Sequence, residues 1–368
     1  TELRAQLEAK GHKFSSETDT ESVAHLLSDL RKAHNGDLTA AMRDAVKALR
    51  GSFTLLAIHA DAPDVIVGVR RNSPLVVGLG DGENFMASDV AAFIEFTKKA
   101  IELGQDEVVT MTPTSVEITD LEGKSVKPKQ YEISWDATAA QKGGFAHFML
   151  KEIHEQPETI FDCLRGRLLT QSGQIMMAGI ENNLEAFAKA PRIIIVACGT
   201  SWHAGLVGEY LIEEFARIPV EVEYASEFRY RNPIINKDDI VIAISQSGET
   251  ADTLAAIKLA KSKGAFVFGI CNVVGSSIAR ETNSGAYTHA GPEIGVASTK
   301  AFTTQITVLS LIALKLGNLK GELSKSKFNH FLHELKIIPS KSVLVLKIPA
   351  LLAKICTFFI PFTCLKVG

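Results

Sequence analysis

The hydrophobic and polar positions follow different patterns in the two halves of the chain. Between about residues 50 and 135, short apolar or alternating runs such as "SFTLLAIH" and "VIVGVR" are separated by turn residues. This pattern predicts a strand-rich unit flanked by helices, an α+β layer domain. From Arg192 onward, continuous apolar runs alternate with helical stretches, and these runs are "RIIIVACG", "VEVEYAS", "DIVIAIS", "AFVFGICN" and "GAYTHAG". Such alternation predicts a doubly wound α/β domain, with a parallel sheet of about five strands covered on both faces.

The segment between the two halves contains a linker and then a helix. "SWDATAAQKGG" is small, polar and ends in two glycines, and "FAHFMLKEIHEQPETIFDCLRGRL" has helical spacing that Pro157 is expected to interrupt. We therefore expect four parts in the chain: a first domain at 1–134, a linker and hinge at 135–156, a second domain at 157–322 and a truncated or aberrant tail at 323–368.

Three segments of the second half place small hydroxyl residues at the start of a predicted helix. They contain Thr200 and Ser201, then Ser245, Ser247 and Thr250, and finally Ser298 and Thr299. Each hydroxyl could cap its helix, because Ser and Thr are preferred N-cap residues. Alternatively, the hydroxyls, the backbone N–H groups and the positive helix ends could together hold a phosphate group. The second segment carries more hydroxyls than one cap requires, which favours phosphate.

The kind of phosphate ligand is narrowed by the motifs that the sequence lacks. No segment matches the P-loop pattern GxxxxGK[ST], and no GxGxxG follows a predicted strand. These absences argue against a nucleoside triphosphate and against a dinucleotide. A sugar phosphate needs one phosphate site and recognition of hydroxyl groups, and it therefore fits the hydroxyl-rich segments better.

Composition excludes several classes of partner. The net charge of −3, the pI near 6.4 and the lack of long like-charge runs give no basic field for nucleic acid or an anionic membrane. The five cysteines are odd in number and form no CxxC pair, which favours reduced thiols in a cytoplasmic protein. The apolar run at 350–365 contains Lys354 and Pro361 and is short for a membrane span. Because the first residue is Thr1, we expect the chain to begin inside a longer gene product.

Several strings of residues resemble a known family. "ACGTS" at 197–201, "ASEFRYR" at 225–231, "SQSGETADT" at 245–253 and "EIGVASTKAFTTQ" at 293–305 resemble the first sugar-isomerase (SIS) domain of the glucosamine-6-phosphate synthases, the isomerizing glutamine:fructose-6-phosphate amidotransferases. "SETDTE" at 16–21, "RGSF" at 50–53 and "HFMLKEIHEQP" at 147–157 are similar to the rear of that family's glutaminase domain, of the N-terminal-nucleophile type, and to the helix after it. The resemblance covers the chain from about residue 1 to about residue 322.

This resemblance implies an activity and a set of binding residues. The family uses ammonia from glutamine to convert fructose 6-phosphate into glucosamine 6-phosphate, without a metal or an organic cofactor. The implied phosphate ligands are Ser245, Gln246, Ser247 and Thr250, and the implied sugar-site residues are Thr200, Ser201, Val296 and Ser298. Asp19 would hold the α-ammonium of glutamine, a role that suits a carboxylate.

The resemblance leaves the catalytic competence of this chain open. The family's catalytic Cys, His, Glu and Lys would lie outside it, before Thr1 and in a second SIS domain, and the full-length enzyme would be a homodimer. The remaining titratable candidates near the hydroxyl segments are His203, Glu249, His289, Glu293 and Lys300, where Lys300 would pair with phosphate or with Glu293. A non-catalytic SIS-type sensor and a glutamine-independent sugar-phosphate isomerase or deaminase are the alternative functions.

Overall fold

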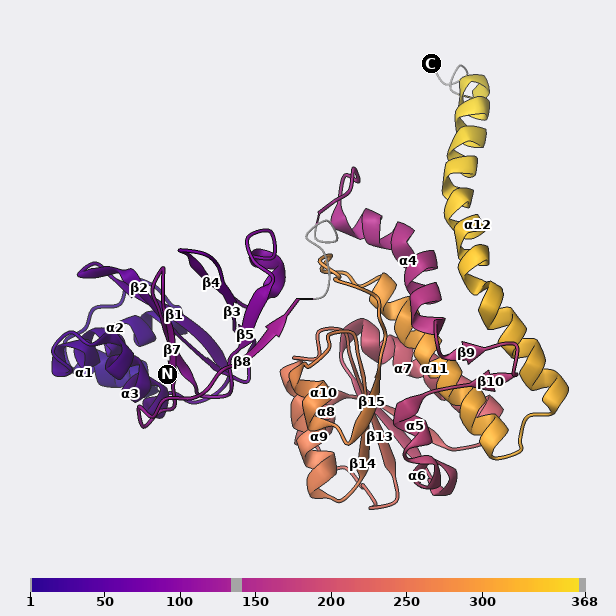
Figure 1. The fold of residues 1–368 in the computed structure, drawn as a ribbon, viewed down its shortest axis with the longest axis horizontal. Coiled ribbons are helices and arrows are strands. Elements are labelled where there is room, and N and C mark those ends of the chain that lie inside the picture. Colours follow the sequence, from indigo (N-terminus) through magenta and orange to yellow (C-terminus); the bar gives the residue numbers. More distant parts are fainter. Residues whose placement is uncertain (1, 134–140, 364–368) are drawn as a thin grey trace. The chain divides into compact units, whose positions relative to one another are not determined.

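The chain divides into two units in the computed structural model (Figure 1), Thr1–Thr138 and Ala139–Gly368. The structure describes the backbone of residues 2–133 and 141–363, and side chains as far as residue 348 apart from residue 91. The linker expected at 135–156 therefore lies partly outside the described residues.

The first unit contains two antiparallel four-stranded sheets and, in its described residues, three α-helices. One sheet has the order β1-β2-β6-β7, with β1 at Phe53–His59, β2 at Ala62–Arg71, β6 at Val108–Met111 and β7 at Val116–Thr119. The other has the order β4-β3-β5-β8, with β4 at Asn84–Ala87, β3 at Val76–Leu79, β5 at Lys99–Glu102 and β8 at Lys129–Glu132. The helices are α1 (Glu2–Ala9), α2 (Asp19–Ala33) and α3 (Leu38–Ala48).

These elements form three layers. Met42 and Val46 of α3 pack on Val67 and Val69 of β2, so this helix covers one face of the first sheet. The opposite face packs on the second sheet through Val77, Ile101, Val109 and Met111. Helix on sheet on sheet is the α+β layer arrangement that the alternating pattern predicts, and this prediction is confirmed.

The second unit is built on a five-stranded sheet in which all neighbouring strands are parallel. Its order is β12-β11-β13-β14-β15, with β11 at Ile193–Ala197, β12 at Val220–Tyr224, β13 at Ile240–Ser245, β14 at Phe266–Cys271 and β15 at Ser284–Tyr287. Each of the five apolar runs forms one of these strands. The doubly wound α/β prediction is therefore confirmed.

Helices cover both faces of this sheet (Figure 1). Along β11, Ile193 and Ile195 belong to the core under α7 (Gly199–Ala216) and α11 (Lys300–Leu319). Ile194 and Val196 belong to the opposite core, under α8 (Ala225–Tyr230), α9 (Ala251–Ser262) and α10 (Ser277–Glu281). The remaining elements are α4 (Phe148–Leu164), β9 (Leu168–Leu169), β10 (Gln174–Ile175), α5 (Ala178–Glu181), α6 (Leu184–Lys189) and α12 (Lys325–Thr363).

Two helices bear on the expectations for the C-terminal part. Among the described residues, only α11 is long and apolar enough to cross a membrane, and 61% of that window is buried inside the unit, as in a core helix. Phe328 and Leu332 of α12 belong to the same core, although α12 lies in the segment expected to be a tail. The side chains of the apolar run at 350–365 lie outside the described residues.

Helix α4 corrects the expectation for Pro157, because it continues through this residue without a break. Proline has no N–H and cannot donate to the carbonyl four residues earlier, which belongs to Ile153. The Gln156 side-chain amide donates to that carbonyl at 3.1 Å instead. A polar neighbour thus replaces the missing backbone donor, and the helix remains continuous.

Candidate functional site

The centre of the parallel sheet contains the point at which the strand order reverses. β11 and β13 lie side by side, with β12 beyond the first and β14 and β15 beyond the second. Ala197 at the end of β11 is paired with Ile244 near the end of β13. In doubly wound folds, ligands bind outside the carboxyl ends of the strands at such a reversal. Two of the hydroxyl-rich segments begin at this edge.

The first hydroxyl-rich segment joins β11 directly to α7. Gly199 has a φ of +58°, which favours glycine and allows the strand to turn at once into the helix. Thr200 is exposed in the first turn. Ser201 is buried, and its Oγ accepts a hydrogen bond from the Gln305 side-chain amide at 3.0 Å. Because Oγ is the acceptor in this bond, the Ser201 hydroxyl hydrogen remains able to donate to a ligand.

The second segment is a tight turn organised by Ser245, the last residue of β13. Ser245 Oγ accepts from the Gly248 N–H at 3.0 Å and lies 2.9 Å from Thr250 Oγ1. Ser247 Oγ accepts from the Glu249 N–H at 3.2 Å. The buried Ser245 hydroxyl therefore holds the turn together, whereas Gln246, Ser247 and Thr250 are only half-buried.

Gly248 is the residue that this turn constrains most strongly. Its φ is +69°, and a Cβ added there would lie 1.9 Å from Ser276 Oγ. Its carbonyl accepts from the Ile278 N–H at 2.9 Å, which ties the turn to α10. The Cys271 thiol lies next to Gly248, and burial raises the pKa of this thiol to about 12. Only glycine fits this position without displacing its neighbours.

The third segment, before α11, is held by an acidic residue. The Glu293 carboxylate accepts from the N–H groups of Thr299 at 2.8 Å and Ala301 at 3.1 Å, and so caps the helix. Val296 is fully exposed. Ser298 Oγ is buried and has no hydrogen-bond partner among the described residues.

These contacts distinguish the two interpretations of the hydroxyl residues. The N-cap residues of α7, α9 and α11 are Cys198, Thr250 and Thr299, and none of the three forms a side-chain capping hydrogen bond. The capping interpretation is therefore wrong for these helix starts. Glu293 occupies the N-terminus of α11, so the N-termini of α7 and α9 are the better candidates for an anion.

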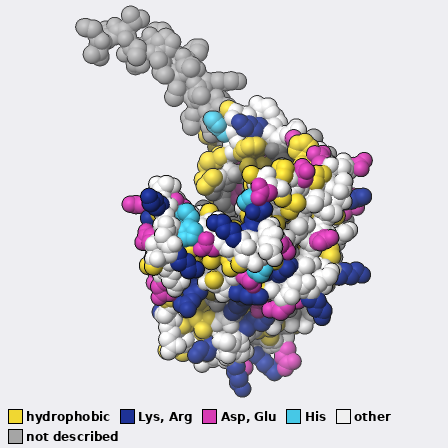
Figure 2. Space-filling model, turned by 90° about the vertical axis from the view of Figure 1, so that its left-hand side faces the viewer, with side chains coloured by type: hydrophobic (Ala, Val, Ile, Leu, Met, Phe, Trp, Pro, Cys, Tyr) yellow, Lys and Arg dark blue, Asp and Glu magenta, His cyan; other side chains and the backbone are white. Residues whose placement is uncertain are grey.

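The charged residues around the loops are paired with protein groups. Asp252 in the first turn of α9 forms an ion pair with Arg229 of α8 at 2.8 Å. Lys300, which was expected to pair with phosphate or with Glu293, is buried and pairs with Glu155 of α4 at 2.7 Å. In the structure Lys300 therefore does not pair with Glu293, and that alternative is corrected. Figure 2 shows acidic and basic side chains interspersed on one face of the molecule.

The two histidine candidates lie in different surroundings. His203 is exposed and packs its ring against the edge of Trp202. Burial and the nearby positive charges of Arg167 and Arg165 lower the pKa of His289. Among the described residues, no group of three or more His, Cys, Asp and Glu side chains could hold a metal ion. Two surface hollows lie near the other end of α11, lined by residues such as Lys315 and Lys336.

In the first unit, Asp19 is the first residue of α2 and is exposed. The turn before it is held by Glu21. The N–H and hydroxyl groups of Ser15 and Ser16 donate to the two Glu21 carboxylate oxygens at 2.6–2.9 Å. These bonds, of which that from the Ser15 N–H has the largest effect, lower the pKa of Glu21 to about 2. Asp19 thus lies at the start of a helix, and the turn before this helix is held in place by Glu21.

Three further residues organise the loops and were not assigned a role from the sequence. Gln305 holds Ser201, and Glu152 of α4 accepts from the N–H groups of Ile294 and Gly295. Asn272, after β14, accepts from the Thr288 hydroxyl and the Ala290 N–H, and donates to the Gly291 carbonyl. All three lie inside strings singled out from the sequence, but those strings do not show which distant atoms they meet.

Comparison with known proteins identifies the two units. Residues 1–95 match the model of the glutamine amidotransferase domain, and residues 186–315 match that of the SIS domain. The chain thus combines a glutamine amidotransferase domain with a sugar-isomerase domain. Over most of its length it is similar to proteins named isomerizing glutamine–fructose-6-phosphate aminotransferases.

The similarity to proteins of that name extends over most of the chain. A protein from Bacteroides thetaiotaomicron is 47% identical over 97% of this chain, which covers 58% of that protein. One from Streptomyces coelicolor is 53% identical over 87% of the chain and 52% of its own length. The chain therefore spans about half the length of these curated relatives. The solved structure of the C-terminal domain of glucosamine-fructose-6-phosphate aminotransferase from Francisella tularensis matches with a TM-score of 0.55 and 41% identity, covering 60% of this chain and 61% of that one.

Proposed function

We propose that this chain is part of an enzyme that uses the amide nitrogen of glutamine to convert fructose 6-phosphate into glucosamine 6-phosphate. In this proposal the first unit binds glutamine and the second binds the sugar phosphate. The relatives with matching domains are named for this reaction. The observation that carries the proposal is the meeting of two hydroxyl-rich turns at the strand-order reversal, with hydroxyls that do not cap their helices.

The phosphate would lie at the N-terminus of α9, bound by Ser245, Gln246, Ser247 and Thr250. Ser247 and Thr250 are half-buried and carry neutral donors, which suit a phosphate monoester in a turn without lysine. Ser245 would also hold the turn, because its buried Oγ accepts from the Gly248 N–H and lies 2.9 Å from Thr250 Oγ1. This division of roles explains why one turn needs more hydroxyls than a helix cap requires.

The sugar would lie against the first and third segments. Thr200 is exposed in the first turn of α7, and Ser201 keeps a hydroxyl hydrogen to donate. Val296 is exposed at the tip of the third segment, while Ser298 carries a buried hydroxyl without a described partner. These four residues offer one apolar contact and several hydroxyl contacts, which is the chemistry that a sugar ring requires.

In the first unit, Asp19 would bind the α-ammonium of glutamine. Its side chain is exposed and, among the described residues, accepts a single long hydrogen bond of 3.5 Å from the Thr20 hydroxyl, so the carboxylate can accept from a cation. The glutamine amidotransferase match at 1–95 favours this reading over a sensor or a glutamine-independent isomerase or deaminase, because neither alternative requires a glutamine site. We assign binding roles, and no acid–base step, to the residues of this chain.

We also propose a cytoplasmic location and a homodimer for the full-length enzyme. Cys163, Cys198 and Cys271 are free thiols, which fits a reducing compartment. Analytical ultracentrifugation of the full-length enzyme tests the dimer, and a single species of monomer mass would refute it.

Thermal unfolding of the 368-residue chain with glucosamine 6-phosphate tests the sugar-phosphate proposal. Ligand at 100 times its Kd should stabilise the folded chain by about 2.7 kcal/mol. Ser247→Ala should lose most of this shift. Ser262→Ala, at the far end of α9 where the hydroxyl donates to Leu259, should keep it. A chain that unfolds cooperatively and shows no shift with saturating ligand would refute the proposed site.

A further inference from the structure

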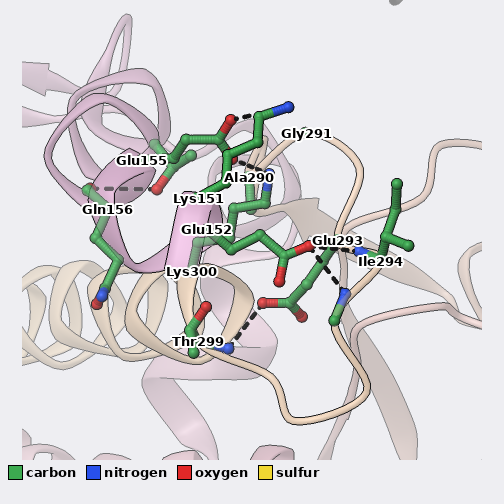
Figure 3. A network of polar contacts seen from close by, with 12 residues as sticks. Lys151, Glu152, Glu155, Gln156, Ala290, Gly291, Glu293, Ile294, Thr299 and Lys300 are labelled. Atoms are coloured by element: carbon green, nitrogen blue, oxygen red, sulfur yellow. Dashed lines mark hydrogen bonds and ion pairs between the residues drawn. The ribbon is translucent and has the colours of Figure 1, made fainter. Parts of the chain in front are cut away.

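Helix α4 supplies two acidic side chains to the third hydroxyl-rich segment (Figure 3). Glu155 forms the ion pair with buried Lys300, at the start of α11. Glu152, one helical turn earlier, instead accepts from backbone N–H groups of Ile294 at 2.6 Å and Gly295 at 2.9 Å. These two hydrogen bonds of Glu152 join residues that are 142 and 143 positions apart in the sequence. The third segment is therefore held by α4, which precedes the parallel sheet in the chain.

Glu152 is an unusual residue for such a contact because it is almost completely buried. Its exposed fraction is 2%, and both backbone donors share its Oε1 atom. Its Oε2 atom has no hydrogen-bond partner among the described residues. A buried carboxylate with one unpartnered oxygen is costly, and removing it would also leave two backbone donors unsatisfied. The contact is therefore specific to an acceptor at this position.

The backbone at Gly295 is closely fitted to this carboxylate. A Cβ added at Gly295 would lie 2.4 Å from Glu152 Oε2, so the Glu152 carboxylate would have to shift. At the other end of the segment, Glu293 accepts from the N–H groups of Thr299 and Ala301. Residues 296–298 are consequently bracketed by two carboxylates, and Val296 and Ser298 lie between these two anchors.

We propose that Glu152 is a positioning residue for the sugar side of the site: by holding Ile294 and Gly295, it sets the positions of Val296 and Ser298 against the sugar. This inference rests on the proposed function, because it assumes that glucosamine 6-phosphate binds at these loops. The hydrogen bonds of Glu152 go to Ile294 and Gly295 and not to the phosphate turn at 245–250. Loss of Glu152 should therefore weaken recognition of the sugar and leave recognition of the phosphate group largely unchanged.

The test compares two ligands in the 368-residue chain by isothermal titration calorimetry. The probes are glucosamine 6-phosphate and inorganic phosphate. The Kd for inorganic phosphate divided by the Kd for glucosamine 6-phosphate is the Kd ratio, and it measures how much the sugar contributes to binding. Glu152→Met, which keeps the size of the side chain but removes both acceptors, should raise the Kd for glucosamine 6-phosphate at least tenfold, which is about 1.4 kcal/mol. The Kd for inorganic phosphate should change less than twofold. Glu152→Gln retains an acceptor oxygen and should recover part of the lost ratio.

Glu158→Gln is the matched control, because Glu158 lies on the same helix, is exposed and forms no hydrogen bond or ion pair with the described residues. It should leave both Kd values unchanged. If Glu152→Met does not fold, Gly295→Ala probes the same contact from the backbone side and should lower the ratio in the same way. Hydrogen exchange of residues 292–299, measured in both variants, should become faster.

The outcomes separate this inference from the proposed function. Binding of neither ligand by the unaltered chain refutes the proposed site and this inference with it. Binding that is lost in Ser247→Ala but keeps its Kd ratio in Glu152→Met and Gly295→Ala refutes only the positioning role. An equal loss of affinity for both ligands in Glu152→Met also refutes it, because Glu152 would then act on stability or on the phosphate turn.

Discussion

Replacing Gly248 by alanine changes the proposed phosphate turn more directly than any substitution of a hydroxyl. The φ of +69° must be adopted by a residue with a Cβ, and that Cβ would meet the Ser276 side chain at 1.9 and 2.4 Å. The turn can relieve the contact only by moving, and movement strains the hydrogen bond from the Ile278 N–H to the Gly248 carbonyl. We expect the variant to fold with a displaced turn that ligand binding must restore.

Two effects determine the expected loss of binding free energy in Gly248→Ala. A left-handed backbone conformation costs a residue other than glycine about 1–2 kcal/mol. Forcing a methyl group into a packed position costs about 1–3 kcal/mol more. If the free turn relaxes and the bound turn must regain the original geometry, about 2 kcal/mol or more appears in binding. The Kd for glucosamine 6-phosphate should then rise about 30-fold or more.

Two further variants separate these effects, with Kd measured by calorimetry and stability by denaturant unfolding. Gly248→Ala combined with Ser276→Gly removes the steric contact and keeps the backbone strain, so its Kd should rise only about 5- to 30-fold. Gly264→Ala, at φ +86° after α9 with only an ordinary contact at 3.7 Å, should lose stability and keep the original Kd. An unchanged Kd in a folded Gly248→Ala chain would refute the assignment of this turn to phosphate.

Two other predictions concern stability. The pKa of Glu21 is lowered from 4.5 to about 2, so its hydrogen bonds stabilise the folded first unit above about pH 4.5, and this contribution is lost as the pH falls toward 2. In thermal melts at several pH values, the melting temperature of Glu21→Gln should fall less steeply with decreasing pH than that of the unaltered chain. An identical pH dependence would contradict this stabilising role of Glu21. Glu155→Gln leaves the buried Lys300 ammonium without its carboxylate and should lower the free energy of unfolding by about 3 kcal/mol. Adding Lys300→Met should recover much of that loss in urea unfolding, and no recovery refutes the pairing as the cause.

The fold could be predicted from the sequence because burial on both faces of a parallel sheet leaves a visible pattern. Runs such as Ile193–Ala197 and Ile240–Ser245 are apolar at every position or nearly so, and both form central strands. The sequence pattern did not predict that α4 continues through Pro157. Whether a helix survives a proline depends on a substitute donor, and the Gln156 side chain provides one through a rotamer that the sequence does not reveal.

The chemical type of the candidate site could be predicted from the sequence, but the long-range contacts that hold its residues in place could not. Hydroxyl-rich turns after β11 and β13 are visible as strings, and the reversal of strand order explains why they meet. The partners of Lys300, Ser201 and Gly295 were not predictable, because they lie more than 100 residues away in sequence. Long-range contacts of this kind depend on how α4 and α11 pack, which periodicity does not specify.

The paired charges around the loops explain why a phosphate site here would use neutral donors. Asp252 would repel an anion at the N-terminus of α9, but Arg229 neutralises it at 2.8 Å. Lys300 is committed to Glu155 and cannot act as a free cation. A phosphate would therefore meet hydroxyls and backbone N–H groups at a helix end, where the helix dipole contributes about 0.3–1 kcal/mol. With so little net charge to attract the ligand, affinity depends on exact donor placement, and this dependence gives Gly248 and Glu152 their importance although neither would need to touch the sugar phosphate.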